Sequence, residues 1–351
     1  MFPWFSDSAP PIGIDIGTRT IKLAQTSRRG DRLVDAVRWE LPVQKQDPSG
    51  KPTDNTSDVI DSLKAATSGR QFVGRRGVYC LGADQLKILN VRLVNVDAGE
   101  IGRSIRAEVA SRLPYSIHEA EIRRIEVPDG VNEGVREFIV FACHRRAITR
   151  IIRIAEAIDV EPVAIDIEPM AVLRSTRMIR RRQQDQSERF IYLNIGYSHT
   201  LLSIFQGDCP LFIKYLPFGG ARFTSSLAKW LGVSFEEAHE MRRNNDDRPI
   251  ERRDPEVNQT ILTAMRPALE GMLSEIAMCI RYHSVSFRGK ALSRLIVGGG
   301  EANSDMVRLL SQSFPQEIVR SQSLTTPSLH RPDRNGQWDI AVGLSMKKVA
   351  A

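Results

Sequence analysis

The sequence has few cysteines, and no two of them are close together. They stand at Cys80, Cys143, Cys209 and Cys279. The chain therefore has no CxxC pair of the kind that builds zinc ribbons or thioredoxin-type redox sites. Isolated thiols of this kind are typical of buried residues in a reducing compartment. Cysteine-based metal or redox chemistry is not expected.

Long hydrophobic runs are also missing. No stretch of roughly 18 apolar residues, the length that spans a membrane, occurs in the sequence. The first eleven residues contain neither a basic region nor an apolar run of signal length. We therefore expect a cytoplasmic protein.

Several familiar catalytic motifs are incomplete. No GxGxxG occurs, so a Rossmann dinucleotide site is unsupported. Gly69 and Gly74 have the spacing of a P-loop, but Arg75 stands where that motif requires lysine. His239-Glu240 lacks the second histidine of a zincin helix, and Gly196–Thr200 lacks the last glycine of a nucleophile elbow.

The overall composition is that of an ordinary globular protein. The chain has 351 residues, of which 42% are hydrophobic and 26% charged, so we expect two domains or one large duplicated unit. The net charge of +7 favours acidic partners such as nucleic acid, a membrane surface or nucleotide phosphates. The densest basic run, 177–182, is typical of a solvated helix end. Because RNA-binding aromatic motifs and zinc fingers are lacking, we do not expect nucleic-acid binding.

The hydrophobic pattern of the first half returns in the second half. Alternating apolar residues predict a hairpin over 12–25, and three strands over 190–195, 201–205 and 211–216. Ile14–Gly17 and Leu193–Gly196 each end a strand and lead through small polar residues into the next strand. This echo at half a chain length predicts a duplicated fold with two similar turns facing each other.

The first turn has the residue types that a phosphate site needs. Gly17 lets the backbone approach a ligand, and Thr18 and Thr20 add hydroxyl donors. Lys22 supplies a cation that could reach a phosphate, and Asp15 could hold the water shell of Mg²⁺. An ordinary Asp-x-Gly hairpin explains this stretch equally well when it is taken alone.

Three further elements follow in a consistent order. Glu168, just before a predicted helix, could orient a water, or it could be a helix N-terminal acid favoured by the dipole. Gly196, Ser198 and Thr200 repeat the donors of the first turn. The glycine run 298–300 leaves room for a base or ribose, or simply makes a tight strand–helix turn. The order of all four elements favours a clamp for phosphates over coincidence.

The chain resembles the actin-like ATPase superfamily and, within it, the PilM family of type IV pilus assembly proteins. The resemblance covers nearly the whole chain. Its specific stretches are 13–22, 105–115, 162–169, 216–220, 233–238, 298–300 and 340–344. It implies an α/β fold of the duplicated actin-like (ribonuclease H-like) type, with two lobes, a nucleotide cleft and an inserted FtsA-type subdomain.

The resemblance also implies a division of the chain. The expected parts are an N-terminal tail over 1–11, the first-lobe core over 12–90, the inserted subdomain over 91–161, a return helix and linker over 162–188, and the second lobe over 189–351. A helical subdomain is expected at about 231–288.

The family's functional residues can be placed on matching positions of this sequence, with ATP and Mg²⁺ as the implied ligands. Glu168 matches the acid that polarises the attacking water in relatives that hydrolyse ATP, and Glu237 and Arg242 match positions near the nucleoside. Asp15, also expected to hold Mg²⁺ through water, belongs with the remaining nucleotide-binding positions: Gly17, Thr18, Thr20, Lys22, Asn194, Gly196, Ser198, Thr200, Gly219, Gly220, Gly298, Gly299 and Gly300.

One position departs from the family pattern. Asn194 stands where the family usually has aspartate. A neutral amide adds no charge to a Mg²⁺ site and accepts no proton. We therefore expect nucleotide binding with slow or absent hydrolysis.

The function that the resemblance implies is that of a nucleotide-binding adaptor at the inner membrane. It would hold the cytoplasmic tail of a PilN-like membrane protein in a groove between the first subdomain and the inserted module, and would connect it to pilus motor ATPases. The alternatives are a phosphotransferase of the sugar-kinase type and an FtsA-like filament protein. Whether the chain self-associates, and whether it serves a pilus, secretion or DNA-uptake machine, stays open.

Overall fold

The computed structural model describes residues 9–43, 53–128, 134–180, 187–287, 290–322, 324 and 336–349. Most of the predicted tail over 1–11 and most of the predicted linker after 180 lie outside the described residues. Within the described ranges, no helix is both long enough and apolar enough to cross a bilayer.

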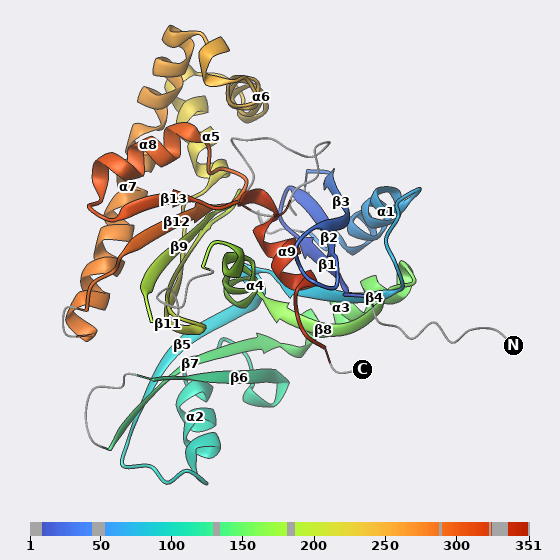
Figure 1. The fold of residues 1–351 in the computed structure, drawn as a ribbon, viewed down its shortest axis with the longest axis vertical. Helices are drawn as coiled ribbons and strands as arrows, with labels where there is room; N and C mark the ends of the chain where they lie inside the picture. The colour runs from blue at the N-terminus through green and yellow to red at the C-terminus, as the bar shows by residue number, and fades with distance from the viewer. Residues whose placement is uncertain are drawn as a thin grey trace, which may run out of the picture.

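The first lobe is built on a five-stranded sheet with the strand order β3-β2-β1-β4-β8. β1 pairs antiparallel with β2 and parallel with β4, and β4 pairs parallel with β8. Two helix pairs pack on this sheet, α1 with α3 and α4 with α9 (Figure 1). The strands are β1 (Ile12–Ile16), β2 (Thr20–Thr26), β3 (Leu33–Glu40), β4 (Arg76–Leu81) and β8 (Glu161–Ile167), and the helices are α1 (Thr56–Thr67), α3 (Arg145–Ala157), α4 (Glu168–Ser175) and α9 (Asp339–Ser345).

The second lobe repeats this topology. Its sheet has the order β11-β10-β9-β12-β13, again with an antiparallel hairpin and meander followed by two parallel strands. The repetition confirms the predicted duplicated α/β fold. The strands are β9 (Arg189–Ile195), β10 (Thr200–Gln206), β11 (Cys209–Leu216), β12 (Arg294–Gly298) and β13 (Glu317–Arg320), and the helices are α5 (Gly220–Leu231), α6 (Phe235–Asp246), α7 (Pro255–Ser286) and α8 (Ser304–Ser313).

A separate three-stranded sheet lies between β4 and α3 in the sequence. Its order is β5-β7-β6, formed by β5 (Leu86–Val94), β6 (Ala120–Val127) and β7 (Val135–His144), and α2 (Ile101–Ala110) covers it (Figure 1). It has its own core, in which Ile105 and Val109 of α2 pack with Phe138 and Val140 of β7. The inserted subdomain was expected to begin at residue 91, but its first strand, β5, begins at Leu86. The segment after this sheet, α3, returns to the first sheet.

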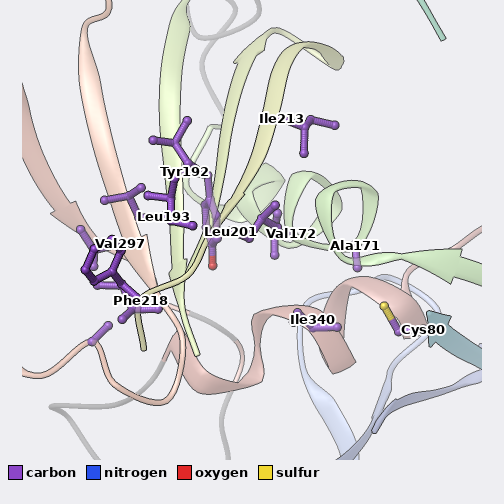
Figure 2. Packing of buried hydrophobic residues seen from close by; sticks show 14 of the residues in the cluster. Cys80, Ala171, Val172, Tyr192, Leu193, Leu201, Ile213, Phe218, Val297 and Ile340 are labelled. Atoms are coloured by element: carbon purple, nitrogen blue, oxygen red, sulfur yellow. The ribbon is translucent and has the colours of Figure 1, made fainter. Parts of the chain in front are cut away.

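The two lobes share one hydrophobic core. Figure 2 shows Leu201 of β10 beside Val172 of α4. Ala171 of the same helix, Ile340 of α9 and Cys80 of β4 belong to the same core. α4 and α9 approach closely, because a Cβ placed on Gly343 would lie only 1.9 Å from the carbonyl oxygen of Ala171. Closely packed interiors resist deformation, so α4 and α9 hold the lobes in register around the cleft.

Candidate functional site

A cleft of about 790 Å³ lies between the two lobes. It is lined by both hairpin turns, by the N-terminus of α4 and by the loop after β12. These segments are far apart in the sequence, so the duplicated fold brings them together. The predicted site residues that line the cleft are Asp15, Gly17, Thr18, Thr20, Lys22, Glu168, Asn194, Gly196, Ser198, Gly299 and Gly300.

The two turns have the same backbone geometry. The amide of Gly17 donates to the carbonyl of Thr20 at 3.0 Å, and the amide of Gly196 donates to that of His199 at 3.0 Å. A Cβ on either glycine would lie 3.0 Å from the accepting carbonyl oxygen. The turns also touch each other, since the hydroxyl of Ser198 donates to that of Thr18 at 2.6 Å.

The first turn carries a buried charge pair. Asp15 on β1 lies opposite Lys22 on β2 in the strand register, and the Lys22 Nζ donates to its Oδ2 at 3.2 Å. Only 5% of Asp15 is exposed. At the same place in the second hairpin, Asn194 lies opposite Leu201. The second turn therefore lacks both the acid and the cation of the first.

The second turn is held from behind by the N-terminus of α5. The amides of Gly220 and Ala221 donate to the carbonyls of Gly196 and Tyr197, at 3.1 and 2.8 Å. A Cβ on Gly219 would lie 2.6 Å from both of those carbonyl oxygens. Gly219 and Gly220 do not line the cleft. They serve the site by supporting its second turn.

Two other predicted residues are also used in packing. Thr200 is fully buried in β10, and its hydroxyl donates to the carbonyl of Phe218 at 2.8 Å. Gly298 lies in β12, where an added Cβ would be 2.2 Å from the Tyr192 hydroxyl and 2.4 Å from the Asp339 carboxylate. Burial raises the pKa of Asp339 to about 7. Neither Thr200 nor Gly298 lines the cleft.

The two residues expected near the nucleoside, Glu237 and Arg242, make structural contacts and do not line the cleft. Glu237 accepts from the amide and hydroxyl of Ser234, at 2.9 and 2.8 Å, in a capping box that starts α6. The Ser-x-x-Glu spacing is the sequence signal for this role. Arg242 is buried and donates to the Gly220 carbonyl at 2.8 Å and to the Glu301 carboxylate. It ties α6 to α5 and to the loop after β12, outside the cleft lining.

Sequence reasoning missed several side chains that line the cleft. Tyr197 and His239 meet edge to face with ring centroids 6.0 Å apart, and the Arg19 guanidinium lies 5.6 Å from the Tyr197 centroid. Arg243 of α6 pairs with Glu40 of β3 at 3.2 Å, which bridges the two lobes. Arg19 and Tyr197 are sequence neighbours of the turn residues, whereas Glu40, His239 and Arg243 belong to β3 and α6, and no motif requires any of them.

The predicted water-orienting acid has an unexpected neighbour. The Glu168 Oε2 lies 3.6 Å from the Nε2 of His199, an ion pair longer than a hydrogen bond. The Tyr215 ring packs edge to face on the His199 imidazole with centroids 4.9 Å apart. Burial opposes protonation of His199, but the adjacent negative charge of Glu168, helped by Asp84 and Asp15, outweighs it. The pKa of His199 is therefore raised above its ordinary value.

The similarity to known proteins extends over nearly the whole chain. The sequence model of the family described as type IV pilus assembly protein PilM matches residues 13–346. The chain belongs to the PilM family. Among solved structures, the chain is similar to one titled PilM-PilN type IV pilus biogenesis complex, with a TM-score of 0.77 and 19% identity over 97% of this chain and 98% of that one.

Two other structures carry the same fold. The ethanolamine utilization protein EutJ from Carboxydothermus hydrogenoformans has a TM-score of 0.58 and 15% identity, over 97% of this chain and 91% of its own. MreB5 of Spiroplasma citri bound to AMPPNP has a TM-score of 0.52 and 10% identity, over 96% and 95%. At these identities the likeness concerns the fold alone, which is the predicted actin-like one.

Proposed function

We propose that this PilM-family protein is a cytoplasmic adaptor of a type IV pilus or related machine, which binds ATP in its cleft and the cytoplasmic tail of a PilN-like inner-membrane protein. Family membership and the similarity to a solved PilM–PilN complex support the partner. The net charge of +7 suits a position near anionic lipid. The adaptor would sit at the inner membrane through its partner and connect it to motor ATPases.

The observation that carries nucleotide binding is the pair of matched turns facing each other across the cleft. The first turn presents Gly17 with the hydroxyls of Thr18 and Thr20, and the second presents Gly196 with the hydroxyl of Ser198, the donors that phosphate oxygens need. Lys22 adds a cation on the first-lobe side. Gly299 and Gly300 leave space for the nucleoside end of the same ligand. The fold is shared with an MreB5 structure that holds a triphosphate analogue.

The cleft also suits Mg²⁺ held through water and phosphates. The described residues contain no cluster of three or more histidine, cysteine or acidic side chains that could enclose a metal. Mg²⁺ at nucleotide sites needs no such enclosure, because it keeps several waters and takes one or two carboxylates plus phosphate oxygens. Asp15 is buried, lines the cleft and supplies such a carboxylate. Bound Mg²⁺ would neutralise part of the phosphate charge.

Slow or absent hydrolysis follows from the second turn. Asn194 lines the cleft without a carboxylate. Glu168 is the acid that remains to orient a water, and its Oε2 has no hydrogen-bond partner among the described residues. Because position 194 has no acid to act together with Glu168, the site would bind the nucleotide well but activate the attacking water poorly.

A tagged-protein pull-down from native membranes in mild detergent tests the adaptor. We expect enrichment of a small single-span protein, lost when that protein's cytoplasmic tail is deleted. A preparation with no membrane partner would contradict the adaptor and favour a phosphotransferase.

Thermal unfolding with and without Mg²⁺ and ATPγS tests the ligand. We expect a rise in Tm that Lys22→Met abolishes, because that change removes the cation beside the first turn. Lys229→Met is the matched control, since Lys229 is exposed on α5 and does not line the cleft. Equal loss of the Tm rise in both variants would contradict the proposed site.

A further inference from the structure

His199 lies in a cross-lobe cluster that the nucleotide site does not explain. Its partner Glu168 is the first residue of α4 in the first lobe, whereas His199 belongs to the second turn and Tyr215 to β11 in the second lobe. The side chain of Glu168 is 10% exposed and that of His199 is 25% exposed. The pair is thus largely shielded from water, which strengthens its electrostatic coupling.

The imidazole is particular to the second turn. In the first turn the equivalent position, whose carbonyl accepts from the turn glycine, is occupied by Thr20. Tyr215 supports the imidazole ring from one side, and its own hydroxyl is buried without a hydrogen-bond partner among the described residues. Burial and the negative charge of Glu168 raise the pKa of Tyr215 well above its ordinary value, so it stays neutral.

The charges around His199 are mostly negative. Glu168 faces it from α4, Asp15 from β1 and Asp84 from the turn before β5, and each favours the imidazolium. Lys22 of β2 is paired with Asp15 and offsets part of that acid's charge. The other titratable neighbours of the cluster, Cys80 of β4 and Tyr215 of β11, have raised pKa values and are neutral in the physiological range.

We propose that His199 is a positioning residue: as an imidazolium it holds the Glu168 carboxylate across the cleft, and its deprotonation releases that carboxylate toward the bound nucleotide. This rests on the proposed nucleotide site. The pair is neutral overall when His199 is protonated and carries one negative charge when it is not. A rise in pH therefore frees Glu168 and weakens the binding of an anionic ligand at the same time.

The sign of the pH effect on stability follows from the raised pKa. A histidine whose pKa is higher in the folded state contributes stability below its unfolded pKa, and that contribution is lost as the pH rises through the folded value. The ion pair should therefore stabilise the free protein under mildly acidic conditions and not under alkaline ones.

Two measurements on the free protein test the pair without any nucleotide. NMR titration of ¹³C-labelled histidines, with the His199 signal assigned by its loss in His199→Gln, should give a pKa above that of free histidine which falls in Glu168→Gln. A double-mutant cycle of the same two changes should show coupling at about pH 6 that is lost at about pH 9. An unshifted pKa that ignores Glu168→Gln, or a coupling that does not change with pH, would overturn the proposal.

The effect on the ligand is measured with a fluorescent ATP analogue and Mg²⁺. Between about pH 6 and pH 9 the affinity of the wild type should fall about tenfold more than that of His199→Gln, because only the wild type loses a nearby positive charge. The difference between the two proteins removes the titration of the analogue itself. His118→Gln is the control and should behave as wild type, because His118 is exposed and lies just before β6 of the separate three-stranded sheet.

The outcomes separate the two proposals. Absence of analogue binding at every pH, with the free-protein coupling intact, would refute the nucleotide site and with it the release of Glu168 toward a nucleotide. Binding with parallel pH profiles in wild type and His199→Gln would leave the nucleotide site standing and overturn the role of His199.

Discussion

The two hairpin turns of the cleft share a backbone and differ in nearly every side chain that could act on a ligand. Both close with a 3.0 Å hydrogen bond from the turn glycine. The first then carries Asp15 and Lys22, while the second carries Asn194 and His199 and is supported by α5. The duplicated fold thus preserves the backbone shape of the turn, which in the proposed nucleotide site would clamp the phosphates. In the proposed site, Asp15 and Lys22 of the first turn would supply charge to the ligand, whereas the second turn supplies His199 and is itself held by α5.

Removing the support of the second turn should have the largest effect. In Gly219→Ala the new methyl would lie 2.6 Å from two backbone carbonyl oxygens, which cannot move without shifting the turn itself. We expect a loss of about 3 kcal/mol of unfolding free energy, together with loss of nucleotide binding. Chemical denaturation measures the first and a fluorescent ATP analogue the second.

Gly300→Ala is the matched control for that change. Gly300 lines the cleft, whereas Gly219 stands behind it, and a Cβ on Gly300 would meet no atom within 4 Å. A stability loss in Gly300→Ala as large as in Gly219→Ala would show that the contact with the second turn is not the cause.

Making the first turn resemble the second should remove its metal dependence. In Asp15→Asn the cleft loses the buried carboxylate opposite Lys22. We expect the strengthening of ATP affinity by Mg²⁺ to fall about thirtyfold, close to 2 kcal/mol. Titration calorimetry with and without Mg²⁺ measures it. Asp84→Asn, which removes another acid of the cleft lining, is the control. If it weakens the Mg²⁺ effect on ATP affinity equally, the metal does not depend specifically on the carboxylate of the first turn.

The reverse exchange should partly restore hydrolysis. Asn194→Asp places a carboxylate in the second turn at the position that Asp15 has in the first. We expect phosphate release to rise by about tenfold, or about 1.4 kcal/mol in activation free energy, because an acid can hold the Mg²⁺ water shell and accept a proton. An unchanged rate in a coupled phosphate assay would remove the argument that this asparagine limits turnover.

The duplication could be predicted from the sequence because it depends on a repeated local pattern. Strand alternation followed by a glycine turn was visible at 14–17 and 193–196, and both turns lie where it indicated. β3 and α1 were not predicted. α1 starts at Thr56, where a stretch rich in proline, glycine and polar residues ends, and it is stabilised by packing on α3 and β3. Such support comes from tertiary contacts that a local pattern does not contain.

The site was predictable where backbone chemistry decides it and less so where side-chain partners do. The turn glycines and Asp15 line the cleft as their motif indicates. Glu237 was expected near the nucleoside, and the structure shows that it also caps α6 with Ser234, a contact that the Ser-x-x-Glu spacing signals. His199 could not be assigned, because its role depends on Glu168 and Tyr215, which come from other elements.

The smallest expected effect concerns the direct contact between the two turns. Ser198 and Thr18 are exposed, and the hydrogen bond between them competes with water. Ser198→Ala and Thr18→Val should each change stability only slightly, with a coupling of about 0.5 kcal/mol in a double-mutant cycle. A phosphate bound between the turns would use the same hydroxyls, so saturating nucleotide should abolish that coupling. A coupling that persists unchanged with nucleotide bound would mean that the hydroxyls of the two turns hold each other rather than the ligand.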